Sequence, residues 1–176
     1  MKLSIMLATT MTLAATAHAE PIALVEKPDH VTEATVTVDA PPDAVYRMVT
    51  DYAHWPSLLT DVMSARVESG GRDDARVRFR SRVLEHEVTV VFANVPDERI
   101  AFHGVQGPPG GRASGTYTLV PIANGTRTRV TADLYLDVVG VASWVVRDSK
   151  IRDMRRAKLQ HDLADVVAYF ASHKTP

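Results

Sequence analysis

The chain has 176 residues, no cysteine and a formal net charge of −1, and 45% of its residues are hydrophobic. The lack of cysteine excludes disulfides, thiol nucleophiles and a lipid anchor on an N-terminal cysteine. The near-neutral charge argues against a nucleic-acid-binding protein, because phosphate contacts require a basic excess. A chain of this length suits a single domain with a sizeable core.

Residues 1–19 have the pattern of a cleavable secretory signal. Lys2 precedes an uncharged run from Leu3 to Ala17, and Ala17-His18-Ala19 is a small-x-small cleavage site. The run is short for a bilayer of about 30 Å, so we expect cleavage after Ala19 rather than an uncleaved anchor. Loss of Lys2 leaves 19 of the 20 basic side chains against 21 acidic ones, a net charge of −2. We therefore expect a periplasmic or secreted protein with one domain, residues 20–176.

The first elements of that domain are one strand and two short helices. Residues 31–39 alternate between polar and apolar side chains, which predicts a strand with Ala34, Val36 and Val38 on one face. Pro42 can open a helix that continues to Val49. Residues 57–61 predict a second, shorter helical turn.

From residue 62 onward the pattern is almost continuously β. Alternation and turn signals predict six strands, at residues 62–68, 76–83, 87–94, 99–103, 113–121 and 126–138. Ala123-Asn124-Gly125 is a hairpin signal, because Asn-Gly tolerates positive φ. Strands joined by hairpins in this way form an antiparallel sheet.

The C-terminal part predicts one amphipathic helix. Ser143 as N-cap gives about thirty residues, and Ser149 is the alternative cap. Because this helix is the only element large enough to cover the sheet, the fold class is α+β, with a curved antiparallel sheet of about seven strands wrapped around it. The apolar stripe of the helix, with Met154 near its edge, contains Trp144, Ile151, Leu159, Leu163, Val166, Val167 and Phe170.

Three segments carry a resemblance to a known family. They are Val38 to Tyr46, Asp51-Tyr52-Ala-His-Trp55-Pro56-Ser-Leu58, and Gly115-Thr-Tyr117-Thr-Leu119-Val-Pro121 with the hairpin after it. Their order and spacing resemble the START-like superfamily, also called SRPBCC, in its branch of polyketide cyclases and coenzyme Q-binding START-type proteins. The resemblance runs from about Val31 to Ser172 and implies a helix-grip fold with a cavity between sheet and helix.

The chain departs from that family pattern in two ways. Thr60 stands where coenzyme Q-type members usually have a proline, which weakens the case for a quinone ligand. The secretory signal is also unusual, since most members are intracellular.

The resemblance implies that the apolar side of the sheet and the long helix line a ligand-binding cavity. The expected ligand is a hydrophobic small molecule such as a lipid, isoprenoid, sterol-like compound or quinone, with no cofactor and no metal. The alternative from the residues alone is that the same side chains fill a dry core, together with Met63, Ala65 and Val67 of the first long strand. The candidate ligand-binding residues are Trp55, Val77, Phe79, Ser81, Val90, Phe92, Phe102, Tyr117, Leu119, Val130, Leu134, Met154 and Leu163.

Four arginines, at positions 76, 78, 80 and 82, alternate along one strand. If Val77, Phe79 and Ser81 face the helix, the arginines must face solvent, because strand side chains alternate. Glu68 and Glu87 on the neighbouring strands are the expected partners. We therefore interpret the arginines as the solvated back of the sheet rather than as an anion-binding site.

The apolar segment before the helix could rest transiently on an anionic membrane surface. Val141, Trp144 and Val146 would enter the interface. The alternative is a helix start that packs into the core with a solvated basic face. The basic residues beside this segment are Arg147, Lys150, Arg152, Arg155, Arg156 and Lys158.

No catalytic motif stands out. His161 and Asp165 lie four residues apart, but no third metal ligand accompanies them, and an exposed pair is the simpler interpretation. A periplasmic binding or carrier protein is the first hypothesis. A polyketide cyclase or aromatase-type enzyme that uses Tyr117, His103 or Asp51 is the second, and an accessory domain with a collapsed pocket is the third.

Overall fold

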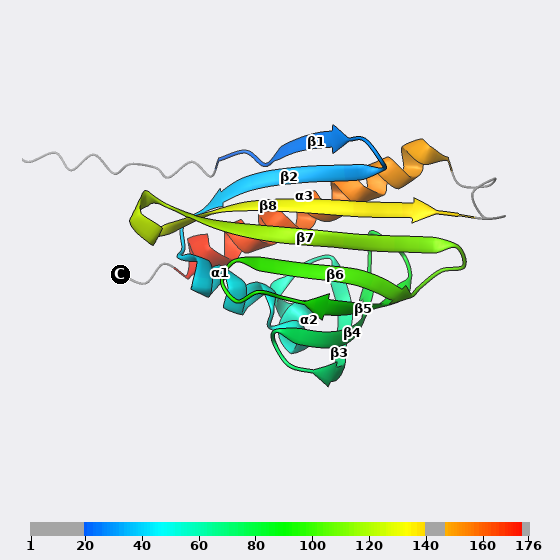
Figure 1. Ribbon diagram of the computed structural model, residues 1–176, viewed down its shortest axis with the longest axis horizontal. Helices are drawn as coiled ribbons and strands as arrows, with labels where there is room; N and C mark the ends of the chain where they lie inside the picture. The colour runs from blue at the N-terminus through cyan, green and yellow to red at the C-terminus, as the bar shows by residue number, and fades with distance from the viewer. Residues whose placement is uncertain (1–19, 140–146, 174–176) are drawn as a thin grey trace, which may run out of the picture.

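The computed structural model describes residues 20–139 and 147–173. One antiparallel sheet of eight strands, in the order β1-β2-β8-β7-β6-β5-β4-β3, curves around the long helix α3 (Figure 1). The α+β helix-grip fold predicted from the sequence is therefore confirmed, with one additional strand. The elements are β1 (Ala23–Lys27), β2 (Val31–Val38), α1 (Pro42–Val49), η1 (Tyr52–His54), α2 (Trp55–Leu58), β3 (Val62–Gly70), β4 (Asp74–Ser81), β5 (Glu87–Ala93), β6 (Arg99–Gln106), β7 (Gly111–Ile122), η2 (Ala123–Gly125), β8 (Arg127–Val138) and α3 (Asp148–Ser172).

Strand β1 is the element that the sequence pattern did not predict. It pairs with β2 from Ala23 opposite Thr35 to Lys27 opposite Val31. Its side chains are almost all exposed, so it has no apolar alternation to read. Lys27 helps to attach this edge strand to the sheet, because its ammonium contacts Glu33 of β2 and Asp133 of β8.

The register of the sheet puts the predicted apolar residues on one concave face. Directly paired residues of an antiparallel sheet point to the same side. The pairs Val77–Val90, Phe92–Phe102 and Leu119–Val130 are all of this kind. Asn124 adopts φ of 57° in the turn that joins β7 to β8, as the Asn-Gly signal predicted.

Strand β3 departs from the predicted pattern. A register shift lies between Val62 and Ser64, so Met63 is an extra residue without a partner opposite it on β4. Met63 is 47% exposed and Val67 36% exposed, whereas Val62 is buried. The expectation that Met63 belongs to the concave face was therefore wrong, because it lies at the bulge and is exposed. Val67 pairs with Val77 and lies on the concave face as expected, but it is partly exposed because β3 is an edge strand.

Helix α3 is shorter and more polar on its buried face than predicted. It begins at Asp148 after an extended Arg147, which gives 25 residues rather than about thirty, and Ser149 lies inside its first turn. Ser143, the favoured cap, lies outside the described residues. Ile151, Leu159, Leu163 and Val166 are buried as expected. Within residues 20–139 and 147–173, no helix combines the length and apolarity needed to cross a membrane.

Arg155 corrects the expectation of a solvated basic face. It is only 4% exposed and points toward the sheet. Its guanidinium donates to Thr32 Oγ1 at 2.9 Å and to the carbonyl of Leu136 at 3.0 Å, and it lies 3.4 Å from Glu26. The side chain thus ties α3 to β1, β2 and β8 at once.

The arginine row on β4 lies on the outer face, as predicted. Glu68 accepts from Arg76 Nε at 2.9 Å and lies 2.7 Å from Arg78 Nε. Arg78 also lies 3.6 Å from Glu87. These exposed contacts hold the pKa of Glu68 below its usual value, mainly through the hydrogen bond from Arg76. These ion pairs therefore link β4 to its neighbours β3 and β5 on the outer face of the sheet.

Candidate functional site

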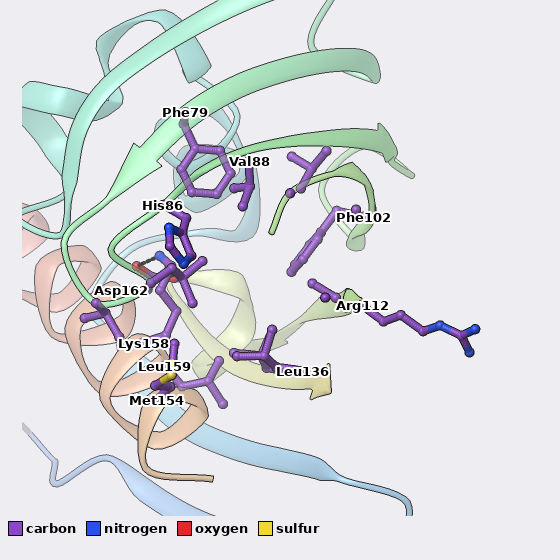
Figure 2. Close-up of a pocket in the computed structure, with 18 of the residues that line it drawn as sticks. Phe79, His86, Val88, Phe102, Arg112, Leu136, Met154, Lys158, Leu159 and Asp162 are labelled. Atoms are coloured by element: carbon purple, nitrogen blue, oxygen red, sulfur yellow. Dashed lines mark hydrogen bonds and ion pairs between the residues drawn. The ribbon is translucent and has the colours of Figure 1, made fainter. Parts of the chain in front are cut away.

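A cavity of about 530 Å³ lies between the concave face of the sheet and α3 (Figure 2). Its walls come from β4 to β8, the α2 region, the loops near residues 83–86 and 104–113, and one face of α3. Most lining side chains are apolar, and Phe79, Val88 and Phe102 lie across the space from Met154 and Leu159 (Figure 2). The volume lies within the range of about 300–1,000 Å³ that is typical of small-molecule sites.

The structure divides the thirteen candidate ligand-binding residues into two groups. Eight line the cavity: Trp55, Phe79, Val90, Phe92, Phe102, Tyr117, Leu134 and Met154. The other five, Val77, Ser81, Leu119, Val130 and Leu163, are buried away from it. These five share the concave or helical face but pack where sheet and helices meet without a gap. Ligand contact by the eight lining residues stays a prediction.

Aromatic rings form the wall near α2. The ring of Trp55 meets those of Phe79 and Phe92 edge-on, at centroid distances of 5.4 and 5.8 Å. Its indole N–H donates to the carbonyl of Val49 at 2.8 Å, which fixes the ring. Phe102 extends the cluster, at 5.8 Å from Phe92. This wall is therefore built from mutually packed rings.

Gly115 of β7 leaves room for the ring of Phe102 in the aromatic wall. A Cβ at this position would lie 2.7 Å from the ring of Phe102 and 2.6 Å from the carbonyl oxygen of Asp133. Any larger residue would push Phe102 toward the cavity. In the Gly-x-aromatic-x-Leu segment, Gly115 makes room for Phe102, Tyr117 lines the cavity and Leu119 packs in the core.

A buried charged cluster reaches the cavity wall through Lys158, Asp162 and Tyr117. We call it the Lys158 cluster, and it contains Lys158, Asp61, Asp162, Tyr117 and Ser81. The Lys158 ammonium lies 2.7 Å from Asp162 Oδ2 and 3.2 Å from Asp61 Oδ2. Tyr117 donates to Asp162 at 3.0 Å and Ser81 donates to Asp61 at 2.7 Å. Figure 2 shows Lys158 and Asp162 meeting beside the cavity.

The interactions within the cluster favour the charged forms of Asp61 and Lys158. Burial raises the pKa of Asp61, but the Lys158 charge and hydrogen bonds from Val83 and Ser81 outweigh it, so the net pKa is lowered. Burial lowers the pKa of Lys158, but Asp162 and Asp61 outweigh it, so the net pKa is raised. Burial and then the nearby Asp162 carboxylate raise the pKa of Tyr117 well above its usual value. The phenol therefore stays protonated at neutral pH.

Sequence reasoning missed Lys158, Asp61 and Asp162 as part of the site. Lys158 was assigned to the solvated basic face, and that assignment was wrong. The signal was nevertheless present, because positions 151, 155, 158, 162 and 166 follow helical spacing and fall on the buried face. Three charged residues inside that repeat indicate polar partners on the facing sheet.

His103, which sequence analysis offered as a catalytic group, is exposed and does not line the cavity, whereas Gln106 does line it. Asp165 accepts from the Thr60 backbone N–H at 2.6 Å and from its hydroxyl at 2.9 Å, and a proline at position 60 could donate neither hydrogen bond. No three His, Asp or Glu side chains come together as a metal site within residues 20–139 and 147–173.

The segment proposed for membrane contact is not covered by the structure. Val141, Trp144 and Val146 lie outside the described residues. Of the basic side chains expected beside them, Arg155 and Lys158 are buried and hold partners in the fold, which removes two charges from that basic surface.

Comparison with known proteins places the fold. A model of the family described as polyketide cyclase / dehydrase and lipid transport matches residues 29–171. A START superfamily protein from Mycobacterium smegmatis has a similar structure, with a TM-score of 0.69 at 16% identity over 82% of this chain and 99% of that chain. The search of curated protein sequences found no match.

Two similar structures carry aromatase/cyclase names. The Zhui aromatase/cyclase from Streptomyces sp. R1128 has a TM-score of 0.64 at 22% identity, over 79% of this chain and 92% of that one. The di-domain ARO/CYC StfQ from the steffimycin biosynthetic pathway has a TM-score of 0.68 at 15% identity, over 81% of this chain and 51% of that one. At these identities the likeness shows a shared fold.

Replacing Lys158 with methionine is expected to destabilise the fold in a pH-dependent manner. Without the ammonium, Asp61 and Asp162 face each other as buried like charges, and we expect the free energy of unfolding at pH 7 to fall by about 3–5 kcal/mol. Their pKa values then rise above those of the unfolded chain, so the variant gains stability as pH falls toward 5. The wild type does not, because the lowered pKa of Asp61 keeps its contribution intact above the usual value of 3.8. Urea unfolding from pH 5 to 8 measures the free energy of unfolding of the wild type and the variant. The same dependence of that free energy on pH in both proteins would contradict the prediction.

Proposed function

Because the chain belongs to the polyketide cyclase / dehydrase and lipid transport family, we propose that it binds a hydrophobic small molecule in the cavity between the sheet and α3. The observation that carries the proposal is the cavity of about 530 Å³ with a mainly apolar lining. Transfer of apolar surface from water yields roughly 25 cal/mol per Å², so a buried hydrocarbon body binds usefully without any covalent chemistry. Lipids, isoprenoids, sterol-like compounds and quinones fit this description.

The aromatic wall supports binding of a body with flat or ring-shaped parts. Trp55, Phe79, Phe92 and Phe102 present ring faces and edges on one side of the space. On the opposite side the lining is aliphatic and more flexible, and it includes Leu134, Leu136 and Met154. Such a lining recognises shape and apolarity, while orientation depends on the few polar groups.

Filling the cavity should abolish ligand binding while the fold remains. Leu136 lines the cavity and is partly exposed to it, so Leu136→Trp is expected to occupy ligand space. The matched control is Val120→Trp on β7, where the side chain is 42% exposed outside the cavity. Native mass spectrometry after gentle purification measures co-purified ligand. We expect a bound hydrophobic molecule in the wild type and in Val120→Trp and none in Leu136→Trp; a wild type that never carries or takes up such a molecule would refute the proposed function.

We further propose that the protein acts outside the cytoplasm, on the basis of the signal pattern in residues 1–19. Removal after Ala19 leaves β1, which begins at Ala23, and every later strand in the chain. A carrier in the periplasm would move an apolar molecule through an aqueous compartment.

Intact mass spectrometry of a cell-envelope extract tests this proposal. The expected mature mass corresponds to a chain that begins at Glu20. Replacement of Ala19 by a bulky residue, Ala19→Phe, should block cleavage and leave the precursor mass. Full-length protein confined to the cytoplasmic fraction would contradict secretion, without bearing on the cavity.

A second candidate function is that of a polyketide cyclase-type enzyme. The observation that favours it is Tyr117, whose protonated phenol lies in the cavity wall beside Asp162 and can donate a hydrogen bond to a carbonyl if it turns from that carboxylate. Hydrogen bonding to a carbonyl oxygen assists attack on the carbonyl carbon, which ring closure of a polyketone requires.

Incubation with a linear polyketone distinguishes the enzyme from the carrier. A cyclase is expected to give a ring product with loss of water, detected by mass spectrometry. Tyr117→Phe should lower kcat about 100-fold or more with little change in KM if the phenol assists the reaction. Recovery of unchanged polyketone from the wild type would favour the carrier.

A further inference from the structure

The Lys158 cluster gives the cavity an unbalanced charge. Asp61 and Asp162 are carboxylates, and Lys158 is the one ammonium between them, so the cluster has a net charge of −1. The side chain of Asp61 is fully buried, and those of Asp162 and Lys158 are 10% and 12% exposed. Burial keeps this charge poorly screened, because little water or salt reaches it.

The hydrogens of the cluster are already committed. The Lys158 ammonium donates to both oxygens of Asp162 and contacts Asp61. The hydroxyl hydrogen of Tyr117 goes to Asp162 and that of Ser81 to Asp61. What remains toward the cavity is acceptor capacity, on the phenol oxygen of Tyr117 and the carboxylate of Asp162.

The other charged or titratable residues of the lining are exposed or already partnered. Glu85 and His86 are exposed residues between β4 and β5. Asp133 accepts from Lys27, and Asp137 accepts from Tyr135. Lys150 is an exposed residue of the first turn of α3. Arg112 is exposed, and its guanidinium extends away from the enclosed residues (Figure 2). An anionic ligand group beside Asp162 would therefore meet a buried carboxylate and an ammonium that already contacts two carboxylates, with the exposed His86 ring as the other polar group nearby (Figure 2).

We propose that the cavity selects apolar ligands that carry a hydrogen-bond donor, a hydroxyl or protonated amine, and rejects ligands that end in a carboxylate or other anion. This inference rests on the proposed binding function. A donor group can hydrogen-bond to the free acceptors of Tyr117 and Asp162. A ligand carboxylate would instead be repelled by the negative charge of the buried cluster. Alcohols, phenols and amines with a large apolar body belong to the selected class, and fatty acids belong to the rejected class.

Three fluorescent probes with one apolar body test the inference on the full mature protein. Each is an anthracene with one substituent at the same ring position: methyl, hydroxymethyl or carboxylate. At pH 7 we expect the hydroxymethyl probe to bind at least about tenfold more tightly than the carboxylate probe. Equal or tighter binding of the carboxylate would overturn the inference alone. If none of the three probes binds, the proposed binding function fails and the inference fails with it.

Variants trace any selectivity to the cluster. Asp162→Asn makes the cluster neutral, so the carboxylate probe should bind more tightly and the preference should shrink to about threefold or less. Asp153→Asn removes one carboxylate from an exposed position on the same helix and should leave the preference unchanged.

Tyr117→Phe tests the role of the cluster independently if Asp162→Asn does not fold. It removes the phenol oxygen but none of the charges, so the hydroxymethyl probe should lose about two- to tenfold in affinity. The carboxylate probe should not gain affinity. A preference that survives unchanged in both Asp162→Asn and Tyr117→Phe would overturn the assignment of selectivity to the cluster.

Discussion

The contact of the Lys158 ammonium with two buried carboxylates is the interaction on which the site depends. Lys158 and Asp162 both lie on α3, where the ammonium contacts Asp61 before β3 and Asp162 accepts from Tyr117 of β7, so the cluster links three parts of the chain. Removing the ammonium would leave two buried carboxylates without compensation, which costs more than an ordinary surface ion pair contributes. The same contact sets the position of α3 beside the cavity and provides its polar wall.

Polar tethers explain how a helix can cover a sheet without filling the space beneath it. Continuous apolar packing tends to close every gap, because interiors approach crystal density. Here Arg155 and Lys158 reach the sheet with long side chains and bond to defined partners. Between these contacts the lining residues of helix and sheet face each other across open volume. The charged residues of the buried helix face are therefore part of the reason why a cavity exists.

Sequence patterns predicted the architecture well and the chemistry poorly, for physical reasons. The alternation of Val77 and Phe79 with arginines reports which face of β4 is buried, and the structure agrees. No local pattern reports where two packed surfaces fail to meet, so Val77 and Val130 were grouped with residues that line the cavity. The bulge at Met63 and the edge strand β1 also left little periodic signal. Lys158 was misassigned because a basic residue on a helix is normally solvated, and only its partners on distant segments reveal that it is buried.

The two edge strands of the open sheet are joined by something other than backbone pairing. Near one edge, Glu26 of β1 contacts Arg155 and Arg156 of α3. Near the other, Thr60 and Asp61 lead into β3 and contact Asp165 and Lys158 of the same helix. A closed barrel would fix its circumference through strand hydrogen bonds. This protein instead joins its two edge regions through side-chain contacts with one helix, so the span of the sheet depends on where α3 lies.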